Sequence, residues 1–181
     1  MAMAGGKRQK AVTEAPSALK DGKLSREEIA RHYAATGYDL GGHPAHVIRR
    51  AHQRATMRFQ ELMGRHGLTP TQFAALATVL RYGEVSQNEL GRMTAMDPST
   101  ISIVVRKLLK LGLVVGVASE TDQRLSLIRM TPKGVRATLP LLDESAEVGR
   151  RVLSPLNPAE QKVFLSLLRR VAEGDEPTSE R

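Results

Sequence analysis

A capped helix followed by two short β-branched stretches constrains the fold of this chain most. Asp97 is a strong helix cap and Pro98 suits the first helical position, so a helix is predicted to begin there and to end at Gly112. Two β-branched stretches, 113–117 and 125–130, then flank a polar loop. Helix, strand, charged loop and strand in this order predict a winged helix-turn-helix, whose helix enters a major groove of DNA.

The predicted helix has two different faces. At 100° per residue, one side collects Ile101, Val104, Val105, Leu108 and Gly112. The other side and its flank carry the candidate DNA contacts, which are Ser99, Thr100, Ser102, Ile103, Arg106, Lys107 and Lys110. Hydroxyls can bond base edges or phosphates, arginine can bind guanine, and isoleucine can contact a thymine methyl. An ordinary amphipathic helix with a solvated basic face would show the same pattern. The choice between this helix and a DNA-binding helix therefore depends on the neighbouring segments.

A second, shorter helix is predicted just before this one, within residues 84–96. Ser86 and Glu89 have the spacing of a capping box, and Leu90 and Met93 are predicted to face inward. The link between the two helices is short enough for the turn of a helix-turn-helix. The fold class predicted from these segments is mainly α with a small β-hairpin wing.

The chain from residue 68 to residue 134 resembles the MarR (multiple-antibiotic-resistance regulator) family of bacterial repressors. The matching pieces, in order, are Leu68-Thr-Pro-Thr-Gln-Phe73, Ser86-Gln-Asn-Glu-Leu90, Asp97-Pro-Ser-Thr-Ile101, Leu111-Gly-Leu-Val114, Asp122-Gln-Arg124 and Thr131-Pro-Lys-Gly134. The resemblance implies that Arg124 enters a minor groove from the wing and that Asp122 holds it in place. It also implies that Ser99, Thr100, Ser102 and Arg106 lie at base- and phosphate-contacting positions.

The chain departs from the family pattern in two places. Ile103 stands where the family often has a basic residue, which shifts the expected readout from hydrogen bonds toward methyl contact. Residues 115–117 are Val-Gly-Val where basic residues are common, which leaves a less charged wing strand. The operator sequence therefore does not carry over from the family.

The formal charge of +8 over 181 residues suits a polyanionic partner. This charge is not concentrated on the helix that is predicted to enter the major groove. Residues 43–66 hold five Lys and Arg against one acid, and residues 1–24 hold five against two. A basic chain can also bind RNA or a membrane. Only 3% of residues are aromatic, and no stacking signature for RNA and no long apolar run is present. We therefore expect double-stranded DNA as the partner, no membrane association and a cytoplasmic protein.

Catalytic and metal chemistry are poorly supported by the sequence. The chain has no cysteine, which excludes disulfides and thiol-based sensing. The five histidines lie among cations and have few acidic neighbours, which disfavours a metal site. There is no nucleophile-elbow pattern and no phosphate-binding glycine loop. We expect neither an enzyme nor a cofactor.

The caps and the changes of composition divide the chain into five predicted regions. These are a flexible basic tail (1–23), N-terminal helices for dimerisation and sensing (24–66), the winged helix-turn-helix DNA-binding domain (67–134), C-terminal dimerisation helices (135–173) and a polar tail (174–181).

The helices predicted outside the winged domain are 26–35, which Gly41-Gly42 separates from the next, then 44–66, 132–153 and 158–172. The second of these carries an apolar stripe of Val47, Ile48, Ala51, Ala55, Phe59, Leu62 and Met63. Such stripes exceed what a small winged domain needs for its own core. By resemblance, the surplus is buried in a homodimer, whose two-fold symmetry matches a palindromic operator.

The first long helix also carries Arg49, Arg50, Arg54 and Arg58, with Glu61 as its only acid. These arginines either form a solvated face that contacts DNA flanks or partner carboxylates, or they form an anion-binding wall. The resemblance places family ligands between the dimer helices and the winged domain, and one branch responds to aromatic carboxylates or their coenzyme A thioesters. The candidate ligand-binding residues are His46, Arg50, Arg54 and Phe73.

The function predicted from these observations is a sequence-specific repressor that a small anionic effector releases from a palindromic operator. The alternatives are a DNA-binding activator or architectural protein without an effector, and an RNA-binding module.

Overall fold

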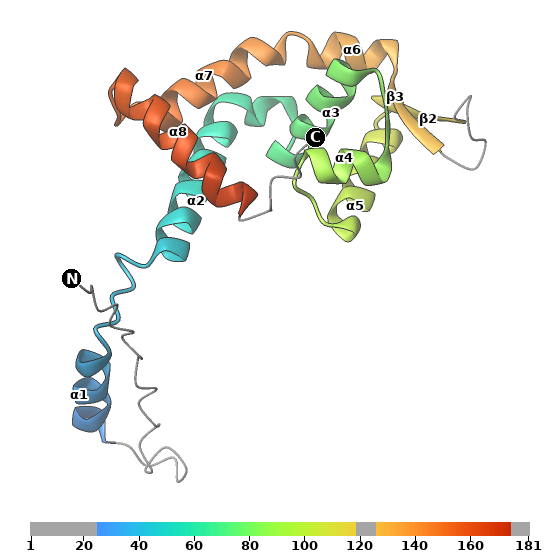
Figure 1. Ribbon diagram of the computed structural model, residues 1–181. Helices are drawn as coiled ribbons and strands as arrows, with labels where there is room; N and C mark the ends of the chain where they lie inside the picture. Colours follow the sequence, from blue (N-terminus) through green and yellow to red (C-terminus); the bar gives the residue numbers. More distant parts are fainter. Residues whose placement is uncertain (1–24, 119–125, 175–181) are drawn as a thin grey trace, which may run out of the picture. The chain divides into compact units, whose positions relative to one another are not determined.

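The computed structural model describes residues 25–118 and 126–174, which fall into two compact units divided between Ile48 and Arg49. The first unit holds α1 (Arg26–Thr36) (Figure 1). Its predicted capping box joins Ser25 and Glu28. The helix ends at Gly37, whose φ of 60° provides a left-handed cap. Gly41-Gly42 lie between this helix and the next, as predicted, in a turn where both glycine amides donate to Asp39.

Helix α2 (Pro44–Met63) begins in the first unit and continues into the second, where η2 (Gly64–His66) follows it. Its predicted apolar stripe is confirmed only toward its end, where Phe59 and Met63 are buried. Val47 and Ile48 are exposed, so the first half of the stripe does not contribute to a core within the chain.

The winged helix-turn-helix is confirmed, with one more strand than predicted. Its elements are α3 (Pro70–Tyr82), β1 (Glu84–Ser86), α4 (Gln87–Met93), α5 (Pro98–Lys110), β2 (Val114–Ala118) and β3 (Ser126–Met130). The strand order is β1-β3-β2, and both pairs are antiparallel. In Figure 1, α4 and α5 pack together beside this sheet.

The helix predicted within residues 84–96 is α4, and the three residues before it form β1, which was not predicted and in which Ser86 lies opposite Leu127 of β3. Ser86 caps α4 by accepting from the Glu89 amide at 3.2 Å. The reciprocal half of the predicted capping box is not formed, although complete boxes occur at α1, α3 and α8.

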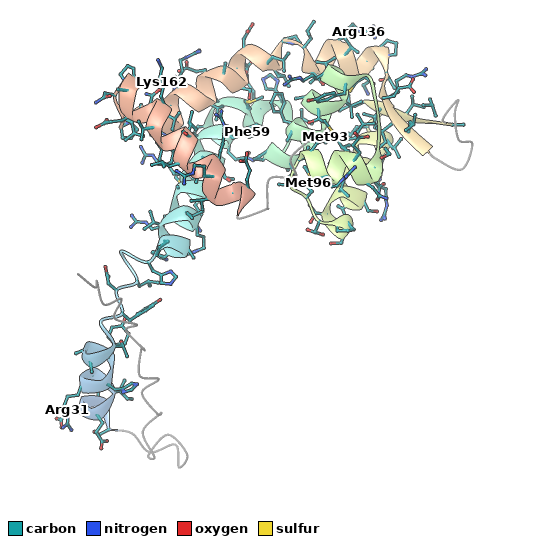
Figure 2. All side chains as sticks on the ribbon, viewed as in Figure 1. Arg31, Phe59, Met93, Met96, Arg136 and Lys162 are labelled. Carbon is teal, nitrogen blue, oxygen red and sulfur yellow. The ribbon has the colours of Figure 1, made fainter. Side chains whose placement is uncertain are left out.

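The core of the second unit lies between α3, α4, α5 and the sheet. The largest apolar side chains that are fully buried are Met63, Leu76, Leu90, Ile101, Leu108, Val79 and Val85. Met93 was predicted to face inward with Leu90, but it is exposed, and Met96 packs against the core instead (Figure 2). Met96 follows a tight turn in which Ala95 has a left-handed φ of 52° and the Met96 amide donates to the Gly91 carbonyl at 2.9 Å.

Three helices follow the wing: α6 (Pro132–Thr138), α7 (Leu141–Leu153) and α8 (Pro158–Glu173). The prediction of one helix over 132–153 was wrong, because Pro140 has no amide hydrogen and separates α6 from α7. The cap of α8 by Asn157 is confirmed. None of the helices in the described ranges combines the length and the hydrophobicity that a membrane-spanning segment needs.

Candidate nucleic-acid interface

Helix α5 presents the two faces that its sequence predicts. Ile101, Val104, Val105 and Leu108 are buried. On the other side, Ile103 has 64% of its surface exposed, and Ser99, Arg106, Lys107 and Lys110 are exposed as well. Thr100 and Ser102 are half-buried on the flanks. The structure therefore places all seven candidate contacts of this helix at its accessible side.

The first turn of α5 is fixed by the carboxylate of Asp97. Its Oδ1 accepts from the amides of Ser99 and Thr100, both at 2.9 Å, and from the Ser99 hydroxyl at 2.5 Å. Its Oδ2 accepts from the Thr100 hydroxyl at 2.6 Å. The hydrogen bonds from the Ser99 hydroxyl, then from the Thr100 hydroxyl, hold the pKa of Asp97 far below its usual range. The cap therefore stays ionised at neutral pH.

The last turn of α5 leads directly into the wing. Gly112 has a φ of 68°, and the Leu113 amide donates to the Leu108 carbonyl at 3.0 Å, which closes the helix. Arg106 Nη2 donates to Ser102 Oγ at 3.4 Å, one turn earlier on the same helix. Arg106, Lys107 and Lys110 thus give the accessible side of α5 a positive charge.

The two wing residues in the prediction, Asp122 and Arg124, lie outside the described residues. The base of the wing is described, and there the Arg129 guanidinium on β3 forms an ion pair with Glu84 on β1. This pair was not predicted, because the sequence indicated the stretch that forms β3 but gave no sign of β1.

The predicted ligand residues are only partly brought together. Arg50 and Arg54 line a groove of about 250 Å³ along α2, together with Gln53, Met57, Arg58 and Glu61. Phe73 does not line this groove, because it is buried against Phe59 with their ring centroids 6.0 Å apart. His46 is half-buried and belongs to the first unit.

A cluster that the sequence did not predict joins η2 to α7. Glu144 Oε2 lies 3.0 Å from His66 Nε2 and 2.9 Å from Arg65 Nη2. The hydrogen bond from His66 is the main cause of the lowered pKa of Glu144. This contact therefore stabilises the fold above the ordinary pKa of glutamate and is lost as the pH falls through the lowered value.

The described part of the chain contains no group of three or more histidine, cysteine, aspartate or glutamate side chains that could hold a metal ion. The charged side chains that cluster on these surfaces are instead mainly cationic, on α5 and along the groove of α2.

The geometry agrees with what comparisons with known proteins find. The sequence pattern of the MarR family matches residues 66–125. The chain is 30% identical to the HTH-type transcriptional repressor NicR of Pseudomonas putida, over 78% of this chain and 89% of that protein.

Two solved structures share the fold. One is BpsR of Bordetella bronchiseptica, described with a mechanism by which 6-hydroxynicotinic acid regulates its DNA binding. Its sequence is 28% identical, with a TM-score of 0.73 over 76% of this chain and 99% of that one. The other is the PcaV transcriptional regulator of Streptomyces coelicolor in complex with its natural ligand, 34% identical with a TM-score of 0.71 over 77% and 98%. The chain is therefore a transcriptional regulator and not an enzyme, and it belongs to the MarR family.

Proposed function

We propose that this regulator represses transcription by binding a palindromic duplex operator as a homodimer, with α5 in the major groove and the wing in the minor groove. The observation that carries the proposal is the accessible face of α5, which presents three hydroxyls, three cations and the side chain of Ile103. The opposite face of the helix is buried. Hydroxyls, arginine and an exposed methyl are the groups that distinguish base pairs in a major groove.

A second copy of the chain is supported by the apolar surface of α8. The side chains exposed there are Val163, Phe164, Leu167, Leu168 and Val171. A contiguous apolar face of this kind is usually buried in a partner. A two-fold dimer would place two copies of α5 about one DNA turn apart, which matches a palindromic site.

Selection from a pool of randomised duplexes tests the DNA-binding proposal. We expect the enriched sequences to share an inverted repeat, and a reporter with that repeat in its promoter to be repressed. Activation of the reporter would instead show that the protein is a transcriptional activator. Equal affinity for a single-stranded RNA of the same length would contradict duplex recognition.

Arg124→Ala should weaken specific duplex binding by more than about 1 kcal/mol, because it removes a charge-assisted contact. The fold and the dimer should be unchanged, as measured by circular dichroism and sedimentation. Arg136→Ala is the matched control, because it removes the same charge from an exposed position on α6. Binding within twofold of the wild type for Arg124→Ala would argue against a wing inserted in the groove.

We further propose that a small anion, an aromatic carboxylate or its coenzyme A thioester, releases the regulator from DNA. An aromatic acid, 6-hydroxynicotinic acid, regulates the DNA binding of BpsR, and the PcaV structure contains the natural ligand of that protein. In this chain, Arg50 and Arg54 line one groove, and guanidinium groups bind carboxylate and phosphate well. Release requires only that the effector bind better to a dimer whose spacing does not fit DNA.

A panel of aromatic acids and acyl-CoA thioesters should therefore contain a compound that both releases the operator and stabilises the protein. At 100 times its dissociation constant, the compound should raise the free energy of unfolding by about 2.7 kcal/mol. Arg50→Ala and Arg54→Ala should reduce this response more than they reduce DNA affinity. If both variants lose DNA affinity and respond normally to the compound, the arginines belong to the DNA-binding surface.

A further inference from the structure

The hydrogen bonds around Asp97 determine where two protons of α5 point. A carboxylate held ionised has only acceptor atoms, so each hydroxyl that contacts it must be the donor. Ser99 Oγ lies 2.5 Å from Oδ1, and Thr100 Oγ1 lies 2.6 Å from Oδ2. Both hydroxyl protons therefore point back toward the cap.

A hydroxyl that has donated its proton still has lone pairs with which to accept. Phosphate oxygens only accept, so neither Ser99 nor Thr100 can bond a phosphate without breaking its contact with Asp97. In the major groove, the exocyclic amines of adenine and cytosine are donors, whereas guanine O6 and N7 and thymine O4 are acceptors. With their protons occupied, these two hydroxyls can bond only the amine-bearing bases.

Ser102 is different, although it lies on the same accessible side. Its oxygen lies 3.4 Å from Arg106 Nη2, and a guanidinium has donors but no acceptor. Ser102 therefore uses a lone pair in this contact and not its proton. The hydroxyls of α5 thus differ in hydrogen-bonding polarity, and the difference arises from Asp97.

We propose that Asp97 is a specificity-determining residue, which makes Ser99 and Thr100 acceptors that select adenine or cytosine in each half of the operator. The inference rests on the proposed function, because it assumes that α5 enters a major groove. In a recognition helix, the N-terminal residues are the ones that contact base edges, which is where Ser99 and Thr100 lie. Asp97 itself is a positioning residue, because it acts through the two hydroxyls.

Asp97→Asn tests this role with little change in shape. Asparagine caps helices as well as aspartate does. Its amide oxygen must occupy the Oδ1 position, because two backbone amides donate there. Its NH2 group then replaces Oδ2 and donates to Thr100, whose own proton turns outward. Thr100 becomes a donor, whereas Ser99 still donates to the amide oxygen and stays an acceptor.

Selection from randomised duplexes should show this change at one position per half-site. For the wild type, we expect adenine or cytosine to be preferred at the Thr100 position by about fivefold to tenfold, the size of one net hydrogen bond. For Asp97→Asn, the preference should change to guanine or thymine there and be retained at the Ser99 position. Relative base preference is the readout, because removing one negative charge raises affinity for every duplex alike.

Thr100→Val in both backgrounds is the control, because valine has a similar shape and no hydroxyl. The preference at the Thr100 position should disappear in the single variant and in the double variant, while the other positions stay selective. The wild-type and Thr100→Val proteins alone decide the matter if Asp97→Asn does not fold, since the loss of an adenine or cytosine preference is still required.

Identical preferences at every position for wild type and a folded Asp97→Asn would overturn the inference, and so would a wild-type preference for guanine or thymine at the Thr100 position. In either case a selected palindrome would still support the proposed function. Failure of the proposed function is a different result, in which the wild type enriches no duplex sequence.

Discussion

Raising the salt concentration from about 50 mM to about 200 mM should lower the affinity of this regulator for its operator by roughly two to four orders of magnitude. Arg106, Lys107 and Lys110 are exposed on α5, and a dimer presents each of them twice, together with Arg124 of each wing. Each phosphate contact contributes about 0.9 to the slope of log affinity against log salt, so we expect a slope of roughly −4 to −7. Fluorescence anisotropy across a salt series measures this slope.

Single lysines allow a sharper test of the same expectation. Lys110→Gln removes one cation from each subunit, so the slope should become less steep by about 2 if both copies contact phosphate. Lys162→Gln, at an exposed position on α8, should leave the slope unchanged. Deleting residues 1–23 should also make the slope less steep if the tail contacts DNA. A wild-type slope near −1 would mean that the excess positive charge serves another partner.

The parts of the fold that the sequence predicted are those that local chemistry determines. Asp97 caps α5 through residues two and three positions away, and Asn157 caps α8 in the same way. The buried and exposed faces of α5 follow from a helical period over thirteen residues. Because these signals are contained within one turn or one helix, no knowledge of the rest of the chain was needed.

Several of the features that were not predicted depend on partners far along the chain. Strand β1 has three residues and is defined by its pairing with β3, where Glu84 lies opposite Arg129. The contact between His66 and Glu144 spans 78 positions. Phe73 was predicted to bind the ligand, yet it is buried in the core, where its ring contacts that of Phe59. Neither spacing nor residue type reveals such contacts in a single sequence.

Gly134 shows how a motif can be recognised before its physical reason is known. It ends the segment Thr131-Pro-Lys-Gly134, and its amide donates to Thr131 Oγ1 at 3.0 Å, as a helix cap predicts. The structure adds a second constraint. A Cβ at this position would overlap the carbonyl oxygen of Leu113 and lie 2.9 Å from its carbonyl carbon. That oxygen also accepts from the Thr131 amide at 3.0 Å, so the backbone there has little freedom to move away.

Gly134→Ala should therefore lower the free energy of unfolding by about 3 kcal/mol or more, at the upper end of what overpacking costs. Gly149→Ala on α7 is the matched control, because a Cβ added at this position would have no other atom within 4 Å. That substitution should raise stability by about 0.5 to 1 kcal/mol, as expected for alanine in place of glycine in a helix. Urea unfolding at one fixed protein concentration measures both, since dimerisation makes stability depend on concentration. A loss below about 1 kcal/mol for Gly134→Ala would mean that α6 can withdraw from the junction of α5 and β2 at little cost, because overpacking in a fixed backbone costs more. Helix α5 would then not be held rigidly against α6.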